Sequence, residues 1–414
     1  MEQTLDRKRI IQLSVVFALI YFFSPNGLAS LPGITVSFLL KDILGMTATQ
    51  AAYFGAITIL GWAIKPLWGI ISDTLPIFGY RRKSYLIFST ILAAIIWFIL
   101  GQIEHYNIIT LITLFTLSSF MYAFMDVLCD ALMIENGKPY NLTGRFQSIQ
   151  WTSVYVASII TGLAGGWAAA NLMPQTVFFI NAIFPLIILA AVVFFIKENK
   201  ALETGEQFKR SLISLKEAFR RPTLWLLAFF LFFWTFSPSF GAPFFYYAVD
   251  KLKFGKMFFG IAAAVGAASA AIGAILYAKF HPRFKTRKLI HLAIAVGVIA
   301  TLFDLIYFTP FVADNLSLAK TIYISSAAIL GIIASITFLV IMNAAALSVP
   351  KYSEGTSFAV LTSFWNIGVM GSAALGGYLF SKIGLQPLII ISAIFTAATW
   401  IIMPFLKFAD ENKI

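Results

Sequence analysis

Residues 143–167, TGRFQSIQWTSVYVASIITGLAGGW, and residues 354–378, EGTSFAVLTSFWNIGVMGSAALGGY, share a pattern of glycines and aromatic residues. Three glycines recur at a constant spacing of 211 residues (355 − 144), namely Gly144, Gly165 and Gly166 against Gly355, Gly376 and Gly377. A second pair of segments, FSPNG at 23–27 and FSPSF at 236–240, recurs at nearly the same spacing of 213 residues (236 − 23). Two matches at nearly one spacing predict that the chain consists of two duplicated halves.

The composition predicts that these halves lie in a membrane. Of the 414 residues, 60% are hydrophobic and only 12% are charged, whereas soluble domains are about half apolar and a quarter charged. Apolar runs long enough to span a bilayer recur along the whole chain. We expect 12 of them, at residues 10–31, 50–72, 84–101, 108–134, 146–170, 175–196, 223–247, 257–279, 289–309, 320–347, 356–380 and 387–407.

A basic segment separates the sixth and seventh runs. Within it Phe208, Leu212, Leu215 and Phe219 recur at helical spacing, which predicts an amphipathic helix at the membrane surface. The expected fold is an all-α membrane protein with twelve transmembrane helices in two pseudo-symmetric six-helix halves. The expected division is an N-terminal half at residues 1–196, a linker at 197–222 and a C-terminal half at 223–414.

The net charge of +12 does not predict a nucleic-acid partner, because Lys and Arg concentrate in alternate connections between the apolar runs. By the positive-inside rule these connections and both termini face the cytoplasm, so we expect a multi-pass protein of the cell (inner or plasma) membrane. Cys129 is the single cysteine, which excludes an internal disulfide.

The expected spans contain ionisable residues, among them Lys65, Asp126 and Asp130. Asp126 and Asp130 are spaced i, i+4 and therefore lie on one helix face. Carboxylates in a membrane are costly and usually face a cavity or a partner, so they either carry a coupling proton and hold substrate, or form a structural pair. Lys65 lies within about 5 Å of the depth of Asp126, from the 1.5 Å rise per residue. It is expected to pair with Asp126 or Asp130, or to bind an anionic substrate.

A polar and aromatic stripe follows on the fifth span, where Gln147, Trp151 and Tyr155 recur at a spacing of four residues. Thr362 and Asn366 occupy the repeat-equivalent positions of Trp151 and Tyr155 on the eleventh span. Such walls suit a flat ring with hydrogen-bonding edges, although aromatic stripes often only pack. Ser237 on the seventh span is a further expected contact.

The two proline segments break the first helix of each half. Ser-Pro-Asn-Gly is turn chemistry, and its recurrence at the same place in both halves predicts a role in gating. We expect Pro25 and Pro238 to be paired bending points, with Asn26 as a polar group exposed beside the first of them.

The connection after the second span, GIISDTLPIFGYRRKS, resembles the cytoplasmic loop motif of the major facilitator superfamily, in which Asp and Arg residues hold neighbouring helices together. Longer strings resemble the folate–biopterin transporter family: KPLWGIISDTLPIFGYRRKSYLI, MDVLCDALMIENGK and SEGTSFAVLTSFWNIG. This resemblance implies a twelve-helix carrier of folates or pterins with the major facilitator fold, commonly proton-coupled. The motif of the family implies functional roles for Lys65, Asp73, Arg81, Asp126, Asp130 and Arg145. The resemblance implies a gating role for Asp73 and Arg81. The segment NGKPYNLTGR departs from the usual charge pattern of the family.

These features predict a secondary active transporter that works by alternating access. Lys65, helped by Arg145, would attract the carboxylates of a folate or pterin-like anion, and Asp126 or Asp130 would exchange a proton. The alternative is a permease or exporter of another amphipathic solute, such as a muropeptide or a drug. The three histidines fall in or near connections and no nucleotide-binding loop occurs, so we expect no enzyme, no metal site and no cofactor. The expected partners are the substrate, protons and the lipid bilayer, and the expected state is a monomer.

Overall fold

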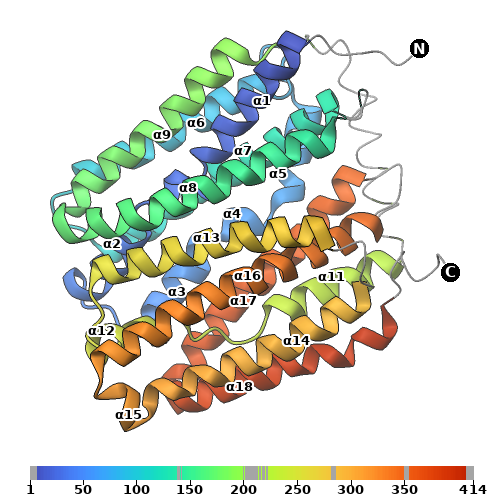
Figure 1. Cartoon of the computed structure of the whole chain (residues 1–414). Helices are drawn as coiled ribbons and strands as arrows, with labels where there is room; N and C mark the ends of the chain where they lie inside the picture. The colour runs from blue at the N-terminus through green and yellow to red at the C-terminus, as the bar shows by residue number, and fades with distance from the viewer. Residues whose placement is uncertain are drawn as a thin grey trace.

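The computed structural model is a bundle of helices (Figure 1). It describes residues 7–137, 140, 142–198, 200, 213, 216, 220, 222–280, 286–348 and 354–406. The helices are α1 (Arg7–Phe22), α2 (Gly33–Phe38), α3 (Ala48–Thr58), α4 (Leu60–Ala63), α5 (Lys65–Thr74), α6 (Lys83–Gln102), α7 (Ile108–Gly137), α8 (Thr143–Asn171), α9 (Pro174–Phe195), α11 (Pro222–Thr235), α12 (Gly241–Asp250), α13 (Lys256–Phe280), α14 (Thr286–Phe303), α15 (Pro310–Ala313), α16 (Leu316–Ser348), α17 (Glu354–Ile383) and α18 (Leu385–Ala398).

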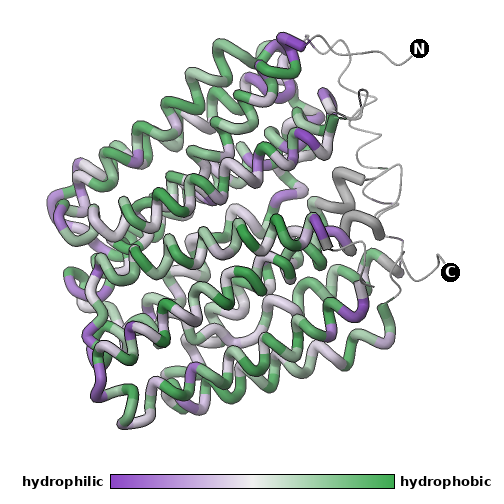
Figure 2. The backbone as a smooth tube through the Cα atoms, viewed as in Figure 1, coloured by the Kyte–Doolittle hydropathy of each residue, from purple (hydrophilic) through white to green (hydrophobic). Residues whose placement is uncertain are grey.

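Nine helices among the described residues are long and apolar enough to cross a membrane: α6, α7, α8, α9, α13, α14, α16, α17 and α18, the last together with the turns that follow it. Their hydrophobic residues run along their length, and hydrophilic residues gather toward the two ends of the bundle (Figure 2). The expected spans 10–31, 50–72 and 223–247 are each broken into shorter helices. The all-α membrane fold is confirmed, and the count of twelve spans stays a prediction.

The helices form two groups, α1 to α9 and α11 to α18, which lie side by side in Figure 1. Between the groups, α8 packs against α13 and α3 packs against α17. Within the groups, α6 packs on α9 and α14 packs on α18 in the same way. The residues Phe208, Leu212, Leu215 and Phe219 lie outside the described residues, and the expected division into halves and linker stays a prediction.

Both proline breaks expose backbone groups that must find partners inside a membrane. Thr161 of α8 donates to the carbonyl of Gly27 at 3.4 Å, beyond the end of α1. In the second half Ser372 of α17 donates to the carbonyl of Ser237, and its own carbonyl accepts from the N–H of Ser239 at 3.0 Å. Thr161 and Ser372 stand at the repeat spacing of 211 residues (372 − 161). The repeated helices therefore supply hydrogen bonds to the broken ones.

The repeated glycines explain how close these helices come. A Cβ on Gly165 would lie 2.9 Å from the carbonyl oxygen of Leu31, and one on Gly376 would collide with the carbonyl of Ser239. The glycine that follows faces the opposite group: a Cβ on Gly166 would lie 2.7 Å from Cα of Gly260 in α13. In the same way a Cβ on Gly377 would lie 2.8 Å from Cβ of Ala52 in α3. Only a residue without a side chain fits at these four crossings.

Candidate functional site

Lys65 and Asp126 form an ion pair within the first group of helices. Lys65 Nζ lies 2.6 Å from Asp126 Oδ2, and the two side chains are only 12% and 15% exposed. The ammonium group also lies over the Trp62 ring, 4.8 Å from its centroid. The structure thus brings together a cation, a carboxylate and an aromatic face, and it makes Asp126 rather than Asp130 the partner of the lysine.

Asp130 has a different partner one helical turn along α7. The Tyr21 hydroxyl donates to Asp130 Oδ1 at 2.7 Å. Tyr21 lies in the last turn of α1, two residues before the proline break begins, and its side chain is buried. The second carboxylate is therefore tied directly to the helix that breaks. Sequence reasoning did not single out Tyr21, and its position before the break was the available signal.

A small cavity lies between the ion pair and the break. It is lined by the side chains of α1, α4, α7 and α9 and the break residues: Ile20, Tyr21, Ser24, Pro25, Trp62, Tyr122, Met125, Asp126 and Ile188. Its volume is about 10 Å³, which is the space that one water molecule needs. Pro25 thus borders the same cavity as Asp126, while Asn26 is exposed and its carbonyl accepts from Ser158 at 3.1 Å.

Asn366 connects the second group of helices to this site. Pro66 has no N–H, so the carbonyl of Trp62, four residues earlier, lacks its helical partner. The Asn366 amide of α17 donates to that carbonyl at 3.1 Å. The expected site residue Asn366 therefore contacts the backbone of Trp62 rather than the cavity. Thr362, one turn earlier, donates to the carbonyl of Ala359 in its own helix at 3.1 Å.

The aromatic stripe of α8 also reaches the second group. Trp151 packs edge-on against Phe338 of α16, with ring centroids 5.3 Å apart, and Phe338 packs against Trp365 of α17 at 5.9 Å. The Tyr155 hydroxyl lies 3.1 Å from Ser335 Oγ. Trp151 and Tyr155 therefore bridge the two groups of helices, with Phe338 as a contact that the sequence did not reveal.

Three other expected site residues lie elsewhere. Arg145 and Gln147 are exposed in the first turns of α8. Ser237 points to α18, where its hydroxyl donates to the carbonyl of Ser392 at 2.8 Å and accepts from Thr396 at 3.2 Å. Pro238 beside it is buried. The structure does not bring these residues together with Lys65.

Arg82 holds the connection between α5 and α6. Its guanidinium lies 2.5 Å from Asp73 and 2.8 Å from Glu135 at the end of α7. Burial lowers the pKa of Arg82, but the two carboxylates outweigh burial and leave its pKa above the ordinary value. Arg81 contributes its backbone N–H, which donates to Glu198 at 2.8 Å. Glu198 also accepts from the N–H groups of Arg82 and Lys83, so it caps the start of α6.

The opposite end of the bundle carries contacts between the groups. Lys41 Nζ lies 2.6 Å from Asp250 in α12, and the Tyr246 hydroxyl donates to the carbonyl of Met46 at 2.8 Å. Phe38 packs edge-on against Phe245 with ring centroids 5.2 Å apart. These contacts join the two groups of helices at the end of the bundle where α2 and α12 meet.

A family model described as the BT1 family matches residues 26–408. The chain belongs to the BT1 family. It is 32% identical to the folate-biopterin transporter of Synechocystis sp., over 94% of this chain and 81% of that protein. It is 24% identical to the probable folate-biopterin transporter 4 of Arabidopsis thaliana, over 89% of this chain and 88% of the relative.

Solved structures of transporters share its fold. A D-xylose–proton symporter superposes with a TM-score of 0.72 over 98% of this chain and 100% of its own, at 12% identity. The nucleoside transporter NupG superposes with a TM-score of 0.67 over 96% and 98%, at 13% identity. The BT1-family chain is thus a multi-pass membrane transporter with the major facilitator fold, and its family is one of transporters and not of enzymes.

Proposed function

We propose that this BT1-family chain carries folates or pterins across a cell membrane by alternating access, with a proton as the coupling ion. The observation that carries this proposal is the ion pair of Lys65 and Asp126 beside the Trp62 ring. Relatives that match most of the chain carry names as folate-biopterin or folate transporters. We also infer that the chain acts as a monomer, that both termini are cytoplasmic, and that residues 1–196 and 223–414 move as two halves about the linker.

In this proposal Lys65 can exchange one anionic partner, Asp126, for another, the substrate. A carboxylate of the substrate competes with Asp126 for Lys65, because both are anions that satisfy one ammonium group. A proton on Asp126 neutralises it and frees Lys65 for the substrate. Trp62 offers a flat face on which a pterin ring stacks. Asp130, held by Tyr21, is the second proton carrier and connects protonation to the break in the first helix.

The remaining predicted residues act around this centre in the proposal. Pro25, Asn26 and Pro238 provide the bending points at the two breaks. Trp151, Tyr155, Thr362 and Asn366 form the wall between the groups, Ser237 orients the seventh span, and Arg145 and Gln147 meet the substrate at the cytoplasmic mouth. Asp73 and Arg81 belong to the cytoplasmic gate together with Arg82.

A binding panel followed by uptake tests this function. Purified chain is heated with folate, with a pterin that lacks carboxylates, and with unrelated aromatic anions, and any ligand that raises the melting temperature is tested in proteoliposomes with and without a pH gradient. We expect folate to stabilise the chain and to accumulate faster with a proton gradient. Stabilisation and uptake of a muropeptide or a drug, with no response to folate or pterin, would replace this substrate class.

A further inference from the structure

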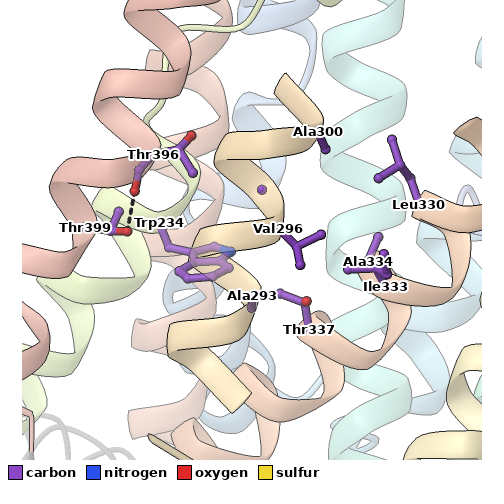
Figure 3. Close-up of a pocket in the computed structure, with 11 residues that line it drawn as sticks. Trp234, Ala293, Val296, Ala300, Leu330, Ile333, Ala334, Thr337, Thr396 and Thr399 are labelled. Atoms are coloured by element: carbon purple, nitrogen blue, oxygen red, sulfur yellow. Dashed lines mark hydrogen bonds between the residues drawn. The ribbon is translucent and has the colours of Figure 1, made fainter. Parts of the chain in front are cut away.

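A second and larger cavity lies in the C-terminal group of helices, away from Lys65 (Figure 3). Its volume is about 220 Å³, and its walls come from α11, α14, α16 and the end of α18. The lining side chains are Trp234, Ala293, Val296, Gly297, Ala300, Leu330, Ile333, Ala334, Thr337, Thr396 and Thr399. In Figure 3 the side chains of α14 and α16 face each other across this space, and Trp234 lies at its side.

The chemistry of the lining suits an apolar occupant. None of the lining residues is charged. The hydroxyl proton of Thr396 is already shared between Ser237 Oγ at 3.2 Å and the carbonyl of Ser392 at 3.0 Å, and Thr399 donates to the carbonyl of Thr396 at 2.6 Å. The other polar side chains of the lining are Thr337 and Trp234, so a strongly polar ligand would lose most of its hydration here for few partners. A hydrocarbon chain has no polar hydration to lose on entering the cavity.

The cavity stands where the other half holds its polar site. Trp234 is two residues before the second break, as Tyr21 is two residues before the first, and their spacing is the repeat spacing of 213 residues (234 − 21). Around Tyr21 the side chains leave only about 10 Å³, and Tyr21 bonds to Asp130. Around Trp234 the facing positions are the small residues Ala293, Gly297 and Ala300. The second half thus has an uncharged cavity of about 220 Å³ where the first half has a charged site with little free space.

The walls of the cavity continue into the surface that faces lipid. On α14, Ile299 is 66% exposed beside Ala300, and on α16 Ile329 is 59% exposed beside Leu330. The α14 and α16 spans are each only 17% buried within the described chain. Val296 lies ten residues from Thr286, the start of α14, which is about 15 Å along the helix. That depth is close to the middle of a hydrocarbon core about 30 Å thick.

We propose that one acyl chain of a membrane phospholipid enters between α14 and α16 and occupies this cavity, with its distal carbons against Trp234. The occupant fills a space that the side chains leave empty, next to the residues that hold the second break. Thr396 lines the cavity and donates to Ser237 at 3.2 Å. The bound acyl chain would therefore pack against Thr396, the α18 residue that is hydrogen-bonded to the second break. This inference rests on the membrane fold and not on the proposed substrate.

Quenching of Trp234 fluorescence by brominated lipid tests the proposal without any transport measurement. The full chain and its Trp234→Phe variant are reconstituted in nanodiscs of phosphatidylcholine, with or without bromine on the acyl chains, and the difference between the two proteins gives the emission of Trp234. We expect most of that emission to be lost with brominated lipid. Bromine near the middle of the bilayer should quench more than bromine near the headgroup, and this comparison needs no further variant.

Two matched variants test whether the acyl chain lies inside the cavity. Ala300→Phe places a ring inside the cavity, whereas Ile299→Phe places the same ring on the exposed surface one residue away. We expect Ala300→Phe to protect Trp234 from bromine and Ile299→Phe to leave the quenching unchanged. Trp234 emission that ignores brominated chains overturns the proposal, and so does equal quenching in both variants. A Trp234 response to folate or a pterin that Ala300→Phe abolishes would assign the cavity to the solute instead.

Discussion

Lys65 Nζ and Asp126 Oδ2 lie 2.6 Å apart, on two different helices and with both side chains largely buried. Removing one member leaves the other charge without its partner. We expect Lys65→Ala to reduce the free energy of unfolding by about 3 kcal/mol and to abolish uptake. The free energy is measured by denaturant titration in detergent, and uptake is measured in proteoliposomes.

The double variant separates structure from transport. Lys65→Ala with Asp126→Ala removes both charges, so it should recover most of the lost stability and none of the uptake. Recovery of uptake together with stability would show that the pair only holds α5 to α7 and does not meet the substrate.

Proton coupling predicts a specific pattern for the two carboxylates. In Asp130→Asn the amide oxygen can still accept from Tyr21, so the contact to α1 is kept while the proton site is lost. We expect this variant or Asp126→Asn to exchange substrate across vesicles but not to accumulate it when a pH gradient is imposed. If pH-driven accumulation persists in both variants, the coupling proton lies on another group.

The contrast between Arg82 and Arg81 gives a test with a built-in control. Arg82 contacts Asp73 and Glu135 through its side chain, whereas the contact of Arg81 with Glu198 uses the backbone N–H. Arg82→Ala should therefore lower the melting temperature and slow transport, and Arg81→Ala should leave the melting temperature nearly unchanged. Differential scanning fluorimetry measures the two melting temperatures. An equal decrease in both variants would contradict the structural role of the Arg82 side chain.

The rise of a helix converts residue number into depth, so the sequence predicted that Lys65 either pairs with a carboxylate or binds an anionic substrate. It did not choose between Asp126 and Asp130, since both lie on one face and only the packing of α4, α5 and α7 decides. The family resemblance carried over Arg81 and not Arg82, and adjacent residues in an irregular connection point in directions that no periodicity sets.

Contacts between the halves were harder to foresee. A proline at position 66 leaves a carbonyl without its helical partner, but no sequence pattern indicates that Asn366, 304 residues later, donates to it. Ser237 illustrates the same limit, because its hydroxyl turns to α18. Repeat spacing predicted which helices correspond, and a side chain at a break can still turn toward either neighbour.

Glycine positions predict a sharp size limit. Gly165→Ala would place Cβ 2.9 Å from the carbonyl oxygen of Leu31, so the break and α8 must move apart. We expect a lower melting temperature and slower uptake. Gly55→Ala in α3 is the control: nothing lies within 4 Å of its Cβ, and alanine favours a helix by about 1 kcal/mol over glycine. A Gly165→Ala variant as stable as Gly55→Ala would show that the crossing is loose.

The ion pair of Lys41 and Asp250 predicts a gate at its end of the bundle. Lys41→Ala removes a contact between the halves, so the cavity at Ser24 should open to that side more often. A Ser24→Cys reporter is suitable because Cys129, the single native cysteine, is buried. We expect a membrane-impermeant maleimide to label the reporter several times faster in Lys41→Ala.

The matched control for this gate is Lys320→Ala. Lys320 Nζ lies over the Phe258 ring at 5.5 Å, a contact within the second half alone. Its removal should leave the labelling rate unchanged. Equal rates in Lys41→Ala and the parent protein would mean that Phe38 and Tyr246 close this end without the ion pair.

The two-glycine steps at Gly165–Gly166 and Gly376–Gly377 have a mechanical consequence. In each step the first glycine is seated on the broken helix of its own half and the second on a helix of the other half. The first glycine of each pair therefore makes a contact within one half, and the second makes a contact across the interface between the halves. If the two halves move against each other as proposed, we expect α8 to roll on α13 and α17 on α3, while each broken helix stays with its own half. A side chain at the second glycine would hinder movement between the halves. A side chain at the first glycine would push the repeated helix away from the broken helix of its own half.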